Sequence, residues 1–182
     1  MSSDATATEQ ALTRIPSGSP EYWRCVDFLI DEAEALDQNR LEDWLEMLHR
    51  EIDYRAPIRV TRERARGLSF SKQGYHFFEN HESLLTRIDR LSTDYAWAED
   101  PPSRTKRFVS NFRVYSIVGS DDLTVRSNLL LYRERLDETH PQFLVGERDD
   151  DLREVDGELQ LVRRLILLDH SILMTPNLGI FL

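Results

Sequence analysis

The sequence predicts an α+β fold, in which helices pack on one face of a curved, mostly antiparallel sheet. Two observations predict it. Apolar residues recur at helical spacing between Glu21 and Leu48. From Arg104 onward, four long strand-like segments follow one another with only short turns between them. Helices first and strands afterwards is an order typical of α+β domains, in which the helices lie on one side of the sheet.

The chain has 182 residues, which is enough for one domain with its own core. Residues 1–20 contain few large apolar side chains and end in a Pro-Ser-Gly-Ser-Pro run, which cannot continue a helix or a strand ladder. We therefore expect residues 1–20 to form a flexible N-terminal arm and residues 21–182 to form a single α+β domain.

Two helices are predicted at the start of the domain. The first begins at Glu21 and is apolar on one face and charged on the other. Its apolar face comprises Tyr22, Val26, Leu29, Ile30, Ala33 and Leu36. Phe28 lies off this face, as an ordinary exposed aromatic residue or as a contact to a partner. A second, short helix follows, and its apolar side comprises Leu41, Trp44, Leu45 and Leu48.

In the middle of the chain the spacing of apolar residues changes twice. Between Ile52 and Val60 apolar and polar residues alternate, which predicts a strand with one solvated face. Pro57 cannot donate to a ladder, so this strand is an edge strand or is bulged at that point. The polar composition of residues 61–76 predicts a long loop, and helical spacing returns between His81 and Ser92.

The second half of the chain predicts a four-stranded meander. The strand candidates are Arg104 to Val118, Leu123 to Arg135, Gln142 to Val155 and Glu158 to Leu168. The separators are short turns, and Asp-Gly at residues 156–157 is a strong signal for a two-residue hairpin. Consecutive strands joined by such turns must pair antiparallel.

Several of these strands carry apolar residues on both faces, as Leu129 and Leu130 illustrate. A sheet covered by helices on one side needs only one apolar face, so we expect another subunit to cover the second. The segment from Ile172 to Leu182 is also strongly apolar. It either folds back onto its own sheet or docks on a neighbour.

Composition excludes several classes of function. A single cysteine, Cys25, excludes an internal disulfide, a two-cysteine zinc site and an iron–sulfur cluster held by this chain. The formal charge of -10 argues against a nucleic-acid surface. No apolar run approaches the ~20 residues of a membrane span, and no secretory signal is present. We expect a cytoplasmic protein that binds neither membrane nor nucleic acid.

The residues that could carry chemistry do not form a recognisable site. His76 and His81 are five residues apart, a spacing that separates them on either a helix or a strand, so we expect no metal site. His49 and Asp53 could form an acid–base pair only if Asp53 left the polar side of its strand. Cys25 is expected at the charged side of the first helix or its border, without an activating histidine.

Charge clusters remain as candidate contact sites. The Arg-Glu-Arg run at residues 133–135 and the acidic run at residues 147–151 could form cross-strand ion pairs, either as a solvated ladder or as the rim of an interface. Arg104, Lys106 and Arg107 follow the stiff Pro-Pro pair at residues 101–102, and their side chains could hold a partner's carboxylates.

The same residues carry a resemblance to a known family. The segment WAEDPPSRT at residues 97–105, continued by VSN at residues 109–111, resembles a motif of the β (small) subunits of aromatic-ring-hydroxylating dioxygenases. Further matches, in order along the chain, are His81-Glu82 with Arg87-Ile88, the LYRER run at residues 131–135, GERDDDLR at residues 146–153, RRLILLD at residues 163–169 and Asn177-Leu178. The resemblance extends from about residue 20 to the C-terminus.

The resemblance implies a cone-like sheet similar to the nuclear transport factor and scytalone dehydratase fold. It also implies assembly with a large α subunit, usually as three α and three β. That α subunit carries a Rieske [2Fe-2S] cluster and a mononuclear iron, and with dioxygen and electrons from NAD(P)H it cis-dihydroxylates an aromatic ring. The resemblance implies that the β subunit is a structural support under the α trimer and carries no cofactor. In some members of the family it affects the substrate range. The His76–His81 spacing resembles part of the α subunit's iron motif, but Gln73 stands where that motif has a carboxylate.

Three hypotheses follow. The leading one is a non-catalytic structural subunit of a ring-hydroxylating dioxygenase, in contact with the α subunit and with other copies of itself. The alternatives are a stand-alone isomerase or dehydratase with an acid–base pocket in the cone, and a self-associating binding module. We expect no catalytic, cofactor-binding or metal-binding residue in this chain. The interface candidates are Trp97, Arg104, Arg107, Arg133 and Phe181.

Overall fold

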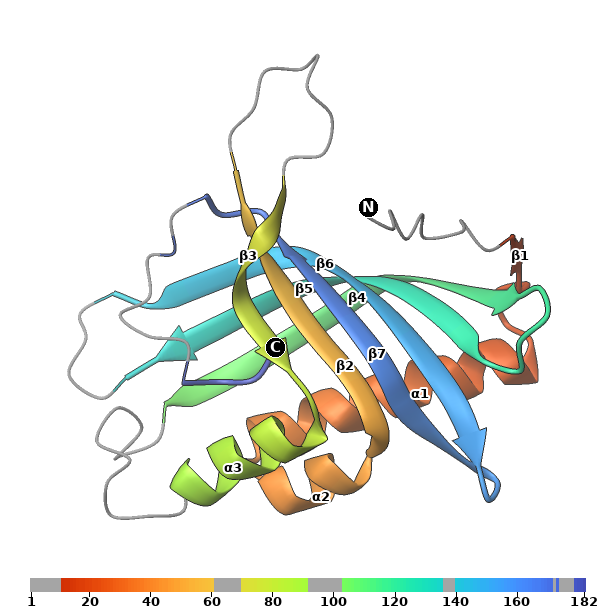
Figure 1. Ribbon diagram of the computed structural model, residues 1–182, viewed down its shortest axis with the longest axis horizontal. Coiled ribbons are helices and arrows are strands. Elements are labelled where there is room, and N and C mark those ends of the chain that lie inside the picture. Colours follow the sequence, from red (N-terminus) through yellow and green to blue (C-terminus); the bar gives the residue numbers. More distant parts are fainter. Residues whose placement is uncertain (1–10, 61–69, 92–102, 136–139, 172, 174–178) are drawn as a thin grey trace, which may run out of the picture.

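The computed structural model describes residues 11–60, 70–91, 103–135, 140–171, 173 and 179–182. These residues form a strongly curved, unclosed sheet with helices on its concave side (Figure 1). The strands are β1 (Leu12–Arg14), β2 (Leu48–Arg59), β3 (Phe70–Glu79), β4 (Arg104–Ile117), β5 (Leu123–Glu134), β6 (Gln142–Val155) and β7 (Glu158–Leu168). The helices are α1 (Pro20–Asp37), α2 (Leu41–Glu46) and α3 (His81–Leu91).

The predicted meander is confirmed. Strands β4, β5, β6 and β7 pair antiparallel in chain order, and the complete order of the sheet is β1-β4-β5-β6-β7-β2-β3. Asp156 and Gly157 join β6 to β7 with φ angles of 52° and 90°, the left-handed conformation that a two-residue hairpin turn requires. Strand β2 adds to the far side of β7 in parallel, and β3 closes that edge antiparallel to β2.

The helices and the inner face of the sheet enclose one core. Ser19 caps α1 by accepting a hydrogen bond from the Tyr22 N–H at 3.2 Å, and Pro20 begins the helix, where its missing N–H costs nothing. Helix α1 packs on β4, and α3 packs on β2 and β3. The expected α+β fold with a curved, mostly antiparallel sheet and N-terminal helices is therefore confirmed.

Part of the predicted N-terminal arm belongs to the sheet. Residues Leu12–Arg14 form β1, which pairs antiparallel with residues 115–117 of β4. Ile15 follows with its side chain buried, and its N–H donates to the Val114 carbonyl at 2.9 Å. The boundary at residue 20 is thus wrong for these residues, because a strand of three residues has no periodicity of its own and its partner lies about a hundred residues away. Residues 1–10 lie outside the described part.

The loop predicted for residues 61–76 is also shorter than expected. Strand β3 begins at Phe70, and residues 61–69 lie outside the described part of the chain. Strand β3 is an edge strand, and Phe77 is its one buried residue, so most of its side chains can be polar. For this reason its sequence lacks the alternation of apolar and polar residues by which a strand is predicted. Of the two alternatives for Pro57, the bulge is confirmed, because β2 lies between two strands and its pairing with β3 shifts register at Pro57.

Among the described residues, no helix combines the length and the apolar character that crossing a membrane would require.

Candidate functional site

Four charged side chains meet in the interior of the cone, all of them fully buried. They are Glu32 of α1, Arg148 and Asp150 of β6, and Arg164 of β7. Arg164 donates to both carboxylate oxygens of Asp150 at 2.8 and 3.0 Å and to Glu32 Oε2 at 2.8 Å. Arg148 lies at ion-pair distance from the same two carboxylates, 3.5 Å from Glu32 and 3.6 Å from Asp150. Two positive and two negative charges make this cluster neutral.

The two arginines of the cluster keep the Glu32 carboxylate ionised. Burial alone would raise the pKa of Glu32, but the guanidinium groups of Arg164 and Arg148 outweigh it and lower this pKa to about 2. The indole N–H of Trp44 adds a hydrogen bond to Glu32 Oε1 at 3.0 Å. Burial also lowers the pKa of Arg164, and here Asp150 and Glu32 reverse the effect and raise it well above its ordinary value. Glu32 is therefore a fixed charge held by two arginines and not a member of an acid–base couple.

The last residues of the chain, 180–182, enter the cone beside this cluster, and we call them the tail. Their side chains are buried. The Tyr54 hydroxyl donates to the backbone oxygen of Leu182 at 2.6 Å and accepts a hydrogen bond from the Leu182 N–H at 2.8 Å. Arg164 donates to the same backbone oxygen at 3.1 Å. Of the two alternatives for the apolar C-terminal segment, the tail therefore folds back into its own domain.

The aromatic ring of the tail fills the space between α2, α3 and β2. The centroid of the Phe181 ring lies 4.5 Å from that of the Trp44 ring, and the Arg87 guanidinium lies over the Phe181 ring at 4.5 Å from its centroid. Arg107 donates to the Phe181 carbonyl oxygen at 2.7 Å. In the part of the chain that the structure describes, Trp, Phe and Leu side chains together with ion pairs fill the interior of the cone.

Three of the five predicted interface residues are internal. Arg107 pairs with Asp37 of α1, and its side chain is 2% exposed. Arg133 is 1% exposed and donates from Nε to Ser103 Oγ at 2.9 Å, and Phe181 belongs to the tail. The interface role predicted for these three side chains is therefore corrected, because the chain itself surrounds them. The sequence could not show this, because each partner is distant in the chain.

The other two candidates have different outcomes. Arg104 is at the start of β4 with its side chain 64% exposed, 3.2 Å from Glu134 of β5, and it stays a predicted interface residue. Trp97 lies outside the described residues.

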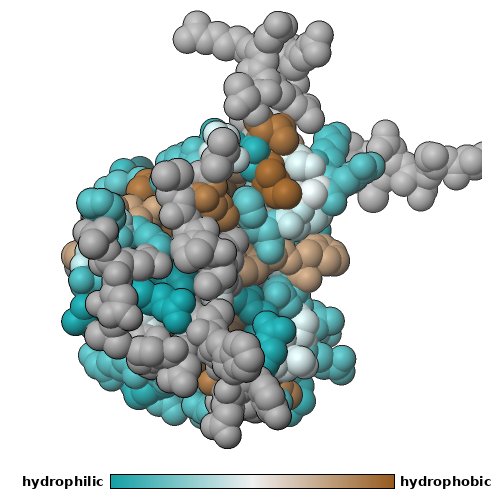
Figure 2. Space-filling view, turned by 90° about the vertical axis from the view of Figure 1, so that its left-hand side faces the viewer, coloured by the Kyte–Doolittle hydropathy of each residue, from teal (hydrophilic) through white to brown (hydrophobic). Residues whose placement is uncertain are grey.

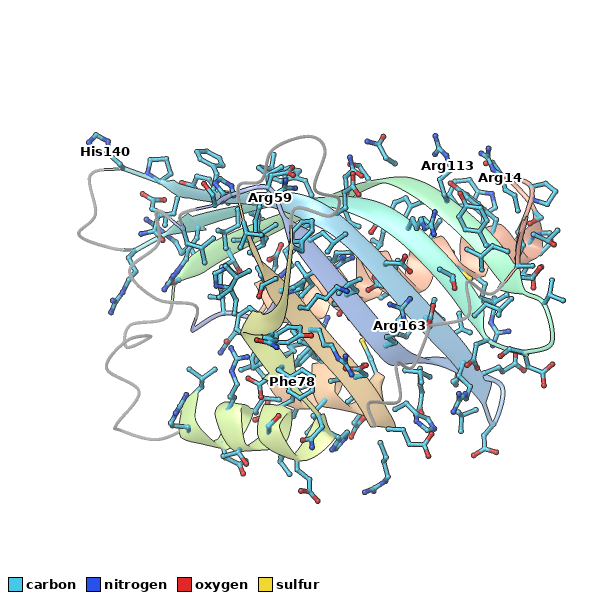
Figure 3. The ribbon with its side chains drawn as sticks, turned by 45° about the horizontal axis from the view of Figure 1, so that its top comes forward. Arg14, Arg59, Phe78, Arg113, His140 and Arg163 are labelled. Carbon is cyan, nitrogen blue, oxygen red and sulfur yellow. The ribbon has the colours of Figure 1, made fainter. Side chains whose placement is uncertain are left out.

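Among the ion pairs of the described residues, none joins the basic run at residues 133–135 to the acidic run at residues 147–151. The register places Arg133 opposite Gln142, far along β6 from the acidic run. Instead β7 supplies the cations. Arg163, labelled in Figure 3, donates to Asp151 at 2.6 Å and to Asp149 at 2.9 Å, while Arg164 turns inward to Asp150. The adjacent residues Arg163 and Arg164 thus form ion pairs on opposite faces of the sheet.

The histidines and the cysteine do not form a catalytic arrangement with each other. His76 lies on β3 and His81 opens α3, and the described residues contain no group of three His, Cys, Asp or Glu side chains placed to hold a metal. His49 Nδ1 accepts from the Glu51 N–H, whereas Asp53 pairs with Arg55. 

Cys25 is fully buried, so of the two predicted positions, the charged side of α1 or its border, the charged side is wrong. Burial raises the pKa of its thiol to about 12, so the thiol stays protonated and unreactive at neutral pH.

The outer face of the sheet carries an exposed apolar surface that we call the outer patch. It consists of Phe108, Leu130, Tyr132, Phe143 and Val145. Phe108, Leu130 and Val145 are direct partners across β4, β5 and β6, and the rings of Tyr132 and Phe143 lie 5.7 Å apart in an edge-on contact. Apolar surface among polar side chains is also visible in Figure 2, at the end of the molecule turned toward the viewer there. Apolar surface of this kind is typical of protein–protein contacts.

The cone fold occurs in enzymes and in small subunits alike. A candidate scytalone dehydratase from Novosphingobium aromaticivorans is similar in fold, with a TM-score of 0.58 at 17% identity over 82% of this chain and 85% of that one. Fold and site together define a cone-shaped α+β protein in which the described residues fill the interior and an apolar patch lies on the outer face of the sheet.

Comparison with known families identifies the chain more closely. Residues 31–175 match the family model of the ring-hydroxylating β subunit. The chain is 34% identical to the β subunit of biphenyl 2,3-dioxygenase from Rhodococcus jostii, over 82% of each chain. It is 36% identical to the β subunit of an N,N-dimethyl phenylurea N-demethylase from a Sphingobium species, over 85% of this chain and 88% of the relative. The chain belongs to the family of ring-hydroxylating dioxygenase β subunits.

A solved structure agrees with this assignment. A chain of naphthalene 1,2-dioxygenase, determined with indole in the active site of that enzyme, superposes with a TM-score of 0.79 at 27% identity, over 88% of this chain and 85% of that one. The predicted family and the predicted similarity to the scytalone dehydratase fold are both confirmed.

Proposed function

We propose that this chain is the non-catalytic structural subunit of an aromatic-ring-hydroxylating dioxygenase of aromatic-compound catabolism. The observation that carries the proposal is the filled interior of the cone. A stand-alone dehydratase or isomerase needs an open pocket with an acid–base couple. Here the tail and the cluster of Glu32, Asp150, Arg148 and Arg164 occupy that volume, and the cluster is internally charge-neutral.

The proposed partner is the large α subunit, which would carry the Rieske [2Fe-2S] cluster and the mononuclear iron, in a cytoplasmic complex of three α and three β chains. The outer patch supports this proposal, since five apolar or aromatic side chains on a sheet face favour coverage by another chain. Relatives of similar identity are β subunits of a dioxygenase and of an N-demethylase. This supports a division of labour in which the large subunit decides the reaction and the small subunit supports it.

Co-expression with a large subunit of a ring-hydroxylating dioxygenase from the same source tests the proposal. We expect the two chains to co-purify, with iron bound to the large chain and with ring hydroxylation only when that chain is present. The matched control is the small subunit expressed alone, which should fold but not oxidise an aromatic substrate. Iron-dependent turnover by the small subunit alone would overturn the proposal. A homo-oligomer that does not bind the large chain would favour the self-associating binding module.

Arg104 offers a residue-level test of the same proposal. Its exposed guanidinium is free to reach a partner's carboxylate beyond its contact with Glu134. We expect Arg104→Ala to leave the melting temperature of the isolated chain within about 2 °C and to weaken capture by the large subunit several-fold. Arg113→Ala, an exposed arginine elsewhere on β4 (Figure 3), is the control. Equal capture of both variants and the parent chain would remove Arg104 from the interface.

A further inference from the structure

Strand β4 has one side that the described chain covers only in part. Strand β5 pairs along its whole length on one side. On the other side β1 pairs with residues 115–117, and Ile15 adds one hydrogen bond to Val114. Among the described residues, no strand pairs with the first part of this edge.

Two hydrogen bonds show which backbone groups face the open side. The Arg107 N–H donates to Asp37 Oδ2 at 2.9 Å, so the backbone groups of Arg107 point away from β5. In an antiparallel ladder every second residue does the same, which assigns Val109 to the open side as well. Asn111, with a φ of 57°, lies in a bulge that adds one residue to β4 and reverses the alternation. This reversal explains why Val114 faces β1.

Three backbone groups are therefore presented at the open edge, and no described residue bonds to them. They are the Arg107 C=O, the Val109 N–H and the Val109 C=O. An acceptor, a donor and an acceptor in a row are the groups that an added strand would bond.

Helix α1 packs on β4 and runs alongside it (Figure 1). The helix forms the second wall of a groove of about 640 Å³. Ile30 and Ala33 line the helix wall, and Phe108 and Val109 line the strand wall. Ile30 is 49% exposed, although the sequence placed it on the apolar face of α1, and Phe108 is 58% exposed. A strand edge beside a helix is the arrangement in which several domains bind an extended peptide as an additional strand.

The charge of helix α1 beside the groove favours one kind of occupant. Asp27, Asp31 and Glu34 follow one another along α1 at spacings of four and three residues, all of them exposed. Of these three, Glu34 also lines the groove, where Asp37 pairs with Arg107 and Lys106 lies on the strand side. A second copy of this chain would bring the same acidic helix and a further formal charge of -10 to the contact. A segment with basic side chains would be attracted instead.

We propose that this groove binds an extended segment of the large subunit, which adds to the open edge of β4 as a further strand. The segment makes three ladder hydrogen bonds to Arg107 and Val109. Its side chains alternate, so that an apolar one contacts Ile30 and the next lies beside Phe108, while a basic side chain reaches the acidic row of α1. The inference rests on the proposed function, since the large subunit is the partner.

Val109→Pro tests the ladder directly. Proline removes the N–H that faces the groove, leaves the bonds between β4 and β5 intact, and is tolerated at such an edge position. The matched control is Val109→Ala, which shortens the side chain but keeps the N–H. We expect Val109→Pro to bind the purified large subunit about tenfold more weakly than Val109→Ala does.

A second pair of variants tests the helix wall without touching the sheet. Ile30→Lys places a positive charge where the basic segment is to lie, and Trp23→Lys makes the same change at another exposed position of α1. We expect Ile30→Lys to weaken binding to the large subunit about tenfold and Trp23→Lys to leave it within twofold. This pair decides the question if Val109→Pro does not fold, because both positions are exposed.

The outcomes separate the two proposals. If the parent chain does not bind the large subunit, the proposed function fails. If the parent chain binds it but each groove variant binds as well as its control, the groove is not the docking site and this inference is overturned. Loss of self-association in the groove variants, with unchanged binding to the large subunit, would assign the groove to a second copy and overturn it too.

Discussion

At the scale of single residues, buried arginines dominate the interior. Arg148 and Arg164 are both fully buried, and each is within ion-pair distance of Glu32 and Asp150. Desolvating four charges costs several kcal/mol per ion, which attraction and hydrogen bonds within the cluster must offset. Such a cluster contributes little net stability when it is complete, but removing one charge leaves an uncompensated one in the interior.

This asymmetry predicts a large effect of a nearly isosteric change. We expect Glu32→Gln to lower the free energy of unfolding by about 3 to 5 kcal/mol, because Arg164 and Arg148 lose half of their compensating charge. Glu34→Gln, at an exposed position two residues along α1, should change it by less than about 0.5 kcal/mol. Urea unfolding of both variants checks this. Similar midpoints would mean that the Glu32 carboxylate does not compensate the charges of Arg148 and Arg164 in the interior.

The pKa of Glu32 predicts a dependence on pH. In the folded chain this pKa is about 2, below its ordinary value of 4.5. A carboxylate with a lowered folded pKa stabilises the fold above its unfolded pKa, and this contribution is lost as the pH falls toward the folded pKa. The stability difference between the parent chain and Glu32→Gln should therefore be constant above pH 5 and shrink between about pH 4.5 and pH 2. Unfolding curves at a series of pH values measure it, and a difference that grows on acidification would contradict the prediction.

At the scale of elements, the tail acts as part of the core. Its backbone is held by Arg107, Arg164 and Tyr54, and the Phe181 ring packs against Trp44. Three residues without regular structure therefore complete an interior that helices and strands leave incomplete.

Truncating the ring of the tail should be costly. We expect Phe181→Ala to lower the free energy of unfolding by about 3 to 5 kcal/mol, the range for a large ring removed from a packed core. Phe78→Ala on β3, whose ring is 64% exposed (Figure 3), should cost less than about 1 kcal/mol. Thermal and denaturant unfolding compare the two, and equal losses would show that the tail is not packed inside the cone in solution.

The elements also differ in how well their sequences reveal them. Strands β4 to β7 are long and joined by short turns, so their pairing follows from connectivity. Strand β1 has only three residues and strand β3 has one buried side chain, so both depend on a partner that local periodicity does not contain. The same reason explains why Arg107 was assigned to an interface: its partner, Asp37, precedes it by 70 residues.

At the scale of the whole molecule, the outer patch is the surface that coverage by another chain would stabilise. A curved sheet whose concave face encloses the core still exposes Phe108, Leu130 and Val145 in one row on its convex face. The isolated chain gains nothing from this apolar row, whereas a complex in which another chain covers it does.

A charge in the centre of this row should separate folding from assembly. We expect Leu130→Asp to change the free energy of unfolding of the isolated chain by about 1 kcal/mol or less and to weaken assembly by at least tenfold. Val118→Asp, at an exposed apolar residue just beyond the end of β4, should assemble as the parent does. Analytical ultracentrifugation of the complexes measures both, and normal assembly of Leu130→Asp would exclude the row from every subunit contact.

Local pattern alone determined the α+β class, the meander and the family of this protein. These features depend on periodicity, turn residues and motif segments that are close together in the chain. Only the tertiary structure decided that the cone is filled, that Arg107, Arg133 and Phe181 face inward, and that Cys25 is inert. The physical reason is that burial and charge pairing are set by residues that are distant in sequence and adjacent in space. For the same reason the open edge of β4, with α1 beside it, could be seen only in the folded chain.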